Sequence, residues 1–163
     1  MRQSRVWWQS IAVAILAVGL CGLAAAIGGA YTASSVGDWY PTLLRPSWNP
    51  PDWVFAPAWS VLYLLMAIAV WMVWRCSQGA AALRAYVLFL AQLALNAAWP
   101  ALFFGLRRPG LAFVEITVLW VAILATMLAF WRHRPVAAWL LLPYLGWVTF
   151  AAALNLWIAL YNP

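Results

Sequence analysis

Five long apolar stretches divide this sequence, and arginine or proline residues bound them. They cover about residues 7–30, 51–74, 81–106, 109–131 and 135–161. A helix that crosses the hydrocarbon core of a bilayer needs roughly 20 apolar residues, and each stretch is long enough. A backbone in lipid must satisfy its own hydrogen bonds, so each stretch is expected to be helical. The sequence therefore predicts an all-α membrane protein, a single bundle of five transmembrane helices.

The composition excludes an ordinary soluble domain. Hydrophobic residues make up 68% of the 163 residues and charged residues only 7%, whereas soluble domains are about one quarter charged. The net charge is +6. The basic residues are dispersed between apolar runs rather than gathered on one solvated face, so a nucleic acid is not an expected partner. The expected partner is the lipid bilayer.

The arginines predict an orientation in the membrane. Those on the side of the N-terminus are Arg2, Arg5, Arg75, Arg84, Arg132 and Arg134. Arg45, Arg107 and Arg108 fall on the opposite side. Because the more basic side of a membrane protein faces the cytoplasm, we expect a multi-pass protein of a bacterial inner membrane with a cytoplasmic N-terminus. The first stretch resembles a signal peptide, but its apolar run continues past Ala24–Ala26, which favours a retained helix.

One connection is much longer than the others. Residues 31–50 carry three of the ten prolines, Pro41, Pro46 and Pro50. A proline-stiffened loop between tightly joined helices is a candidate binding element. Its tryptophans, Trp39 and Trp48, are suited to covering an apolar opening. We therefore expect this loop to act as a lid that caps an interior pocket.

Polar and aromatic residues share one helix face in three of the stretches. The second stretch has Trp59, Tyr63 and Met66, the third has Gln92, Asn96, Trp99 and Phe103, and the fifth has Tyr144, Trp147, Ala151 and Asn155. Amides in hydrocarbon need partners, so these faces should point into the bundle. The polar and aromatic side chains on these faces serve either as interhelical contacts alone or as the lining of a ligand cavity. The spacing leaves both interpretations open.

Few other residues suggest chemistry. Glu115 lies inside a predicted span, where a carboxylate is a candidate proton or cation site. Pairing with Arg107 or Arg108, or snorkelling toward the interface, is the structural alternative. His133 lies in a turn between two arginines, so the bundle interior offers no histidine to ligate haem. Neither a metal site nor a nucleophile–base pair can be assembled. No obligatory cofactor is expected.

Three motifs together resemble one family. They are Asp38-Trp39-Tyr40 with Arg45 to Pro51, Trp53-Val54-Phe55 and Trp59 to Tyr63; Gln92-Leu93, Leu95-Asn96, Trp99-Pro100 and Phe103-Phe104; and Pro143-Tyr144-Leu145, Trp147, Phe150-Ala151 and Leu154-Asn155. In this order, on a chain with five spans, they resemble the TspO/translocator protein family. Its members are also called tryptophan-rich sensory proteins or peripheral-type benzodiazepine receptors. The resemblance covers nearly the whole chain.

The resemblance implies a five-helix transmembrane bundle with an interior pocket capped by the first loop. The family binds porphyrins, haem and synthetic isoquinoline-carboxamide or benzodiazepine ligands, and its animal members bind cholesterol. Together with the aromatic stripes, it implies ligand-binding residues Trp39, Trp48, Pro51, Trp59, Tyr63, Asn96, Trp99, Phe103, Trp147 and Ala151. The family's cholesterol motif needs a basic residue after its tyrosine, whereas Asn162-Pro163 follow Tyr161. Sterol recognition is therefore doubtful.

Three functions compete at this point. The leading one is a membrane sensor or transporter that binds a porphyrin or haem, because a flat macrocycle stacks on indoles while amides meet its polar edge. The second is an enzyme that degrades porphyrin in light, with Trp59 and Trp147 as redox partners. The third is a small proton-coupled exporter that uses Glu115. The sequence leaves open whether the chain forms a homodimer.

Overall fold

The computed structural model describes residues 7–77 and 79–162, and it is helical throughout its regular structure. The long helices are α1 (Trp7–Val36), α2 (Phe55–Cys76), α3 (Ala80–Pro100), α4 (Pro109–Trp131) and α6 (Leu142–Tyr161). Shorter pieces adjoin them: η1 (Tyr40–Thr42), η2 (Asp52–Val54), η3 (Ala101–Gly105) and α5 (Pro135–Trp139).

Together these pieces form five segments long and apolar enough to cross a membrane, and the described residues include no strand. The predicted all-α bundle is confirmed.

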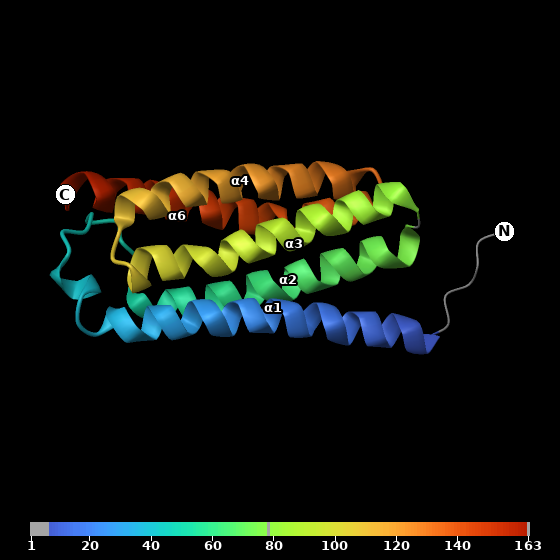
Figure 1. Cartoon of the computed structure of the whole chain (residues 1–163), viewed down its shortest axis with the longest axis horizontal. Coiled ribbons are helices and arrows are strands. Elements are labelled where there is room, and N and C mark those ends of the chain that lie inside the picture. The colour runs from blue at the N-terminus through green and yellow to red at the C-terminus, as the bar shows by residue number, and fades with distance from the viewer. Residues whose placement is uncertain (1–6, 78, 163) are drawn as a thin grey trace.

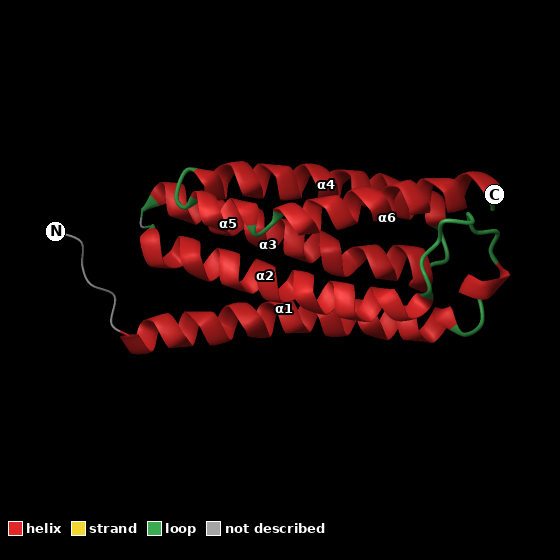
Figure 2. Cartoon of the chain, turned by 180° about the vertical axis from the view of Figure 1, so that it is seen from behind, coloured by secondary structure: helices red, strands yellow, loops and turns green. Residues whose placement is uncertain are grey.

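The long helices run side by side as one elongated bundle (Figure 1). α1 packs against α2 and α3, α3 packs against α4, and α4 packs against α6. α1 begins at the end of the bundle opposite to the end of α6, and the long loop lies beside the end of α6 (Figures 1 and 2). An odd number of spans requires this separation of the two ends.

The side chains sort into an inner face and an outer face on each helix. Met66, Ile123 and Tyr144 have no exposed surface. Many large apolar side chains are exposed on the outside, including Ile15 at 68%, Leu128 at 62% and Leu160 at 68%. An apolar surface of this extent marks a membrane contact rather than a solvated surface.

The loop is shorter than predicted because the first helix is longer. α1 continues to Val36, so residues 31–36 of the predicted loop are helical. Polar side chains at this end bond to backbone carbonyls instead of breaking the helix: Thr32 Oγ1 donates to Gly28 O at 2.8 Å, and Ser35 Oγ donates to Phe104 O at 2.9 Å. The second of these bonds joins α1 to η3.

The third and fifth segments each contain an irregularity near a proline. Pro100 stays inside the third segment, and a π-helical turn, η3, follows it, with Leu106 N donating to Ala101 O at 2.8 Å. The fifth segment is broken at Leu140–Leu141, just before Pro143, and continues as α6. The fifth segment therefore consists of two helices, α5 and α6, and Pro143 lies in the first turn of the second.

Candidate ligand-binding site

A chain of hydrogen bonds joins three helices inside the bundle. Tyr63 of α2 donates to Asn96 Oδ1 of α3, Asn96 Nδ2 donates to the Tyr144 hydroxyl of α6 at 2.8 Å, and this hydroxyl donates to Gln92 Oε1 at 3.0 Å. All four side chains are buried. We call them the polar chain. The amides therefore link helices, as one of the two interpretations predicted, while a ligand-lining role stays a prediction.

Aromatic rings surround one side of the polar chain. The Trp59 ring lies 5.6 Å from that of Tyr63, 6.3 Å from that of Tyr144 and 6.5 Å from that of Trp147, centroid to centroid. Phe55 contacts Trp147 at 5.8 Å. These five residues form the inner aromatic cluster. Within the described residues, the backbones of α2 and α6 are rarely in close contact. Aromatic side chains therefore fill the space between these two helices.

Two hydrogen-bond donors in this region have no partner within the described residues. They are the Gln92 amide nitrogen Nε2 and the Trp147 indole nitrogen Nε1, both buried. An indole N–H and an amide NH₂ act only as donors, and burying such a group without a partner is unfavourable. The inner aromatic cluster therefore adjoins two groups that are available to an acceptor atom of a ligand.

A second aromatic cluster lies nearer the loop. Its members are Trp39, Tyr40, Trp99, Phe103 and Phe104, and we call it the loop-side cluster. Trp99 stacks on Phe103 at 5.0 Å, and Trp39 meets Phe103 edge-on at 5.7 Å. The structure thus divides the predicted ligand-binding residues between two clusters.

The Trp99 indole already has a partner. It donates to Asn155 Oδ1 at 3.0 Å, while Asn155 Nδ2 donates to the carbonyl of Pro109 at 2.7 Å. The Trp99 ring packs against both the main core and the loop-side cluster. Trp99 therefore lies between the main core, which includes Tyr63 and Tyr144, and the residues of the loop-side cluster.

The remaining predicted residues lie at the edges of this region. The Trp48 ring lies 5.7 Å from that of Phe150 of α6, centroid to centroid, although Trp48 is 47% exposed. Pro51 is exposed and precedes η2. Ala151 is half-buried one turn after Trp147 and packs against the core. The loop tryptophans thus lie against the bundle, as a lid requires.

Several polar contacts fasten the loop. Arg107 Nη2 lies 3.2 Å from Asp38 Oδ2, and its guanidinium lies over the Trp39 ring at 5.8 Å. The Asn162 side chain accepts from Leu44 N at 2.9 Å and donates to Leu44 O at 3.1 Å. These contacts hold residues 38–44 of the loop against the bundle end.

Burial raises the pKa of Tyr40 above its ordinary value, although Arg45 nearby acts in the opposite direction. Arg45 also lies over the Tyr40 ring at 5.0 Å and pairs with Asp52 at 3.8 Å. The phenol therefore remains neutral and donates to Asn49 Oδ1 at 2.9 Å. This contact links the first turn of the loop to its last residues.

Arg107 has an unusual backbone, with φ of +54°, a region that residues other than glycine seldom occupy. We expect Arg107→Gln to loosen the loop while changing the overall stability by less than about 1 kcal/mol, because exposed ion pairs contribute little. Hydrogen exchange of residues 38–49 should accelerate. Arg108→Gln is the matched control, and equal exchange in both variants would contradict the role of Arg107.

Glu115 does not form the predicted arginine pair. Its two carboxylate oxygens are buried and have no hydrogen-bond partner within the described residues, whereas Arg107 pairs with Asp38. The alternative of pairing with Arg107 or Arg108 is therefore wrong. The reason is the loop, which places a nearer carboxylate beside Arg107.

The predicted ligand-binding set omits three residues that the structure places at its centre. Gln92 and Tyr144 belong to the polar chain, and Phe55 contacts Trp147. The spacing of Tyr144 and Trp147 on one helix face was the available signal for Tyr144. Phe55 lies four residues before Trp59, so extending the stripe of Trp59 and Tyr63 by one turn was the available signal for Phe55.

Comparison with known proteins agrees with this architecture. The model of the TspO/MBR family matches residues 17–161. The tryptophan-rich protein TspO of Chlorobaculum tepidum is 41% identical over 159 residues, covering 95% of this chain and 99% of that protein.

Two further relatives match over shorter lengths. The translocator protein of Sus scrofa is 45% identical over 120 residues, which are 72% of this chain and 70% of that protein. The tryptophan-rich sensory protein of Cereibacter sphaeroides is 42% identical over 118 residues, covering 72% and 73%. The resemblance found in the three motifs is confirmed: this multi-pass integral membrane protein belongs to the TspO/MBR family.

Proposed function

We propose that this protein binds a tetrapyrrole, a porphyrin or haem, between α2, α3 and α6, and acts as a sensor or transporter of that ligand. The observation that carries the proposal is the inner aromatic cluster beside two buried N–H donors that have no partner among residues 7–77 and 79–162. Flat apolar ligands stack on such rings, and a few polar groups fix their orientation. Relatives named as a translocator protein and a sensory protein support this role.

The ligand would enter the region between α2 and α6, where rings rather than backbone contacts separate the helices. Its rings would replace ring contacts now made between Trp59 and Trp147. Its carbonyl or carboxylate groups would accept from Gln92 Nε2 and Trp147 Nε1, which removes the cost of burying these donors. The loop, with Trp39 and Trp48 against the bundle, would limit access from the membrane surface.

The test is a titration of the purified protein in detergent with protoporphyrin IX, followed by quenching of tryptophan fluorescence. Saturable binding is expected. Trp59→Phe and Trp147→Phe should each weaken binding by about 0.5–1.5 kcal/mol, the contribution of ring stacking beyond buried area. Trp131→Phe is the control, because Trp131 is exposed and contacts Trp139 instead. Failure of the wild-type protein to bind porphyrin would refute the proposal.

Light-dependent porphyrin breakdown is the second candidate function. The edge contact between Trp59 and Trp147 at 6.5 Å favours it, since two oxidisable indoles would adjoin the same ligand. Illumination of the porphyrin-loaded protein in the presence of oxygen, with products identified by mass spectrometry, tests it. Both phenylalanine variants should still bind porphyrin but yield no product. Porphyrin breakdown at the wild-type rate in both variants would mean that these indoles serve binding alone.

The proposal extends to the orientation, with the N-terminus in the cytoplasm of a bacterial inner membrane. Arg2 and Arg5 lie outside the described residues. Cys76, at the end of α2, is exposed and offers a natural probe of the α2–α3 turn. An impermeant maleimide should label it only after cells are opened, whereas Ser47→Cys in a Cys76→Ser background should react in intact spheroplasts. The reverse pattern would invert the orientation.

A further inference from the structure

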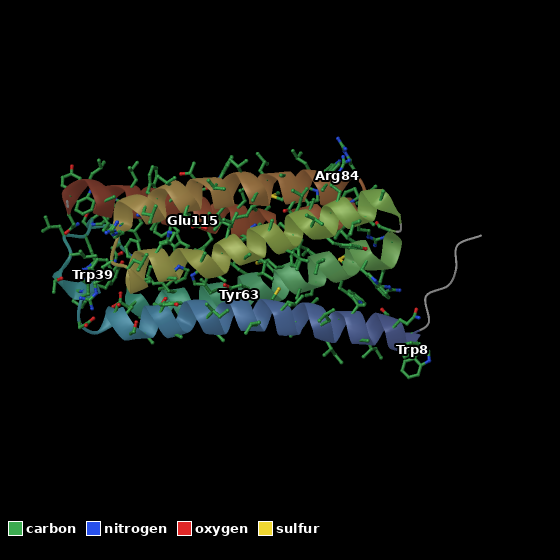
Figure 3. All side chains as sticks on the ribbon, in the orientation of Figure 1. Trp8, Trp39, Tyr63, Arg84 and Glu115 are labelled. Carbon is green, nitrogen blue, oxygen red and sulfur yellow. The ribbon has the colours of Figure 1, made fainter. Side chains whose placement is uncertain are left out.

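Glu115 lies within the membrane-spanning part of α4. It is six residues beyond Pro109, which at 1.5 Å per residue is about 9 Å along the helix. Figure 3 shows it on the half of α4 nearer the loop. Both carboxylate oxygens are buried, and neither has a hydrogen-bond partner within the described residues. An acidic group at such a position is a functional candidate by default.

The surroundings of Glu115 link it to the polar chain. Two hydrogen bonds between α4 and α6 lie on either side of it along α4: Asn155 Nδ2 donates to Pro109 O at 2.7 Å, and Trp120 Nε1 donates to Thr149 Oγ1 at 2.8 Å. Glu115 therefore lies beside the part of α6 that follows Trp147. Earlier on α6, the Tyr144 hydroxyl donates to Gln92 Oε1. The free Gln92 Nε2 and the free Trp147 Nε1 belong to the same region, because Trp147 follows Tyr144 by one turn of α6. A ligand whose acceptor group meets these donors would therefore occupy the part of the bundle on which α4 packs near Glu115.

Few charged or titratable groups face Glu115 from the elements packed on α4. η3 and α5 contain no titratable side chain. Tyr144 and Tyr161 are on α6, and Arg84 and Tyr86 are near the start of α3. Figure 3 shows Arg84 at the end of the bundle opposite to the loop. Tyr144 is thus the titratable group of these elements that belongs to the candidate site. Arg107 and Arg108 lie just before α4, where Arg107 already pairs with Asp38, and neither arginine bonds to the Glu115 carboxylate.

A ligand carboxylate in this region would face the Glu115 carboxylate without an intervening cation. Two carboxylates in a site of low dielectric favour the binding of one proton between them. We propose that Glu115 is a proton-binding site coupled to the ligand, so that the protein takes up a proton from solution when a carboxylate-bearing tetrapyrrole binds. One O–H bond forms, and no electrons are transferred. This inference rests on the proposed function and adds its coupling to protons.

By linkage, proton uptake on binding strengthens binding as the pH falls. One proton per ligand corresponds to an affinity change of about tenfold per pH unit, because a unit of pH is 1.36 kcal/mol per proton. Protoporphyrin IX should follow this trend. Its dimethyl ester, which keeps the macrocycle but lacks the carboxylates, should bind with little pH dependence.

The deciding experiment is calorimetric titration with protoporphyrin IX in buffers of different ionisation enthalpy, at mildly alkaline pH. The slope of binding enthalpy against buffer enthalpy gives the protons taken up per ligand. Wild-type protein should take up more protons than Glu115→Gln, and Asp52→Asn, which alters an exposed carboxylate of the loop, should match wild type.

The outcomes separate the two proposals. Porphyrin binding with equal proton uptake in wild type and Glu115→Gln overturns the coupling and leaves the proposed function in place. Absence of any porphyrin binding to wild type refutes both. If Glu115→Gln does not fold, the wild-type protein alone decides the question. An equal pH dependence of the binding affinity for protoporphyrin IX and for its dimethyl ester overturns the role of a ligand carboxylate.

Discussion

Tyr144→Phe is expected to destabilise the bundle by about 1–3 kcal/mol, the cost of leaving buried polar groups without partners. The substitution removes a single oxygen that accepts from Asn96 Nδ2 and donates to Gln92 Oε1. The ring itself has no exposed surface, so its packing is retained. The expected loss therefore comes from the hydrogen bonds alone, and thermal unfolding in detergent measures it.

Tyr161→Phe is the matched control for this experiment. Tyr161 is on the same helix, is 55% exposed and stacks on Trp157 at 4.3 Å. Its hydroxyl is not part of the polar chain, so the midpoint of unfolding should stay near that of wild type. Equal midpoints for Tyr144→Phe and Tyr161→Phe would mean that the polar chain does not stabilise the fold.

Ala151→Leu is expected to weaken porphyrin binding by tenfold or more, on the order of 1.4 kcal/mol and above. The change adds three carbon atoms one turn after Trp147, on a half-buried position that packs against the core. A planar ligand beside Trp147 needs this volume, and a leucine would occupy it. Protoporphyrin titration and thermal unfolding should be measured on the same preparations.

Ala153→Leu provides the comparison, because Ala153 is exposed on the outer face of the same helix. It adds the same atoms toward the lipid and should change neither binding nor stability. If Ala151→Leu unfolds easily while its folded fraction still binds porphyrin with normal affinity, Ala151 serves helix packing and not the ligand.

The five spans were predictable because apolar length alone determines them. The ends of the spans were harder to predict. Thr32 and Ser35 look like loop residues in the sequence, but their hydroxyls bond to carbonyls within α1 and on η3. The second of these partners is 69 residues away. A contact between residues so distant in sequence leaves no mark in a local pattern.

The candidate site shows the same limit. Helical spacing correctly grouped Tyr144 and Trp147 on one face of α6, and it placed Asn96 and Trp99 on one face of α3. It could not show that Asn96 joins the polar chain while Trp99 stacks with the loop-side cluster. It also could not show that Arg107 is engaged by Asp38. These outcomes depend on how α6 and the loop pack against α3.

The π-helical turn after Pro100 has a consequence for the direction in which Arg107 points. Relative to an α-helix, such a turn contains one additional residue, and each residue of an α-helix advances the chain by about 100° around the axis. The turn takes up this residue, so winding Ala101–Gly105 as a regular α-helix without removing a residue would turn everything beyond it by about that angle. Arg107 would then point away from Asp38, and the loop would lose its ion pair without any change in the loop sequence. The winding of this short segment therefore determines where the arginine points.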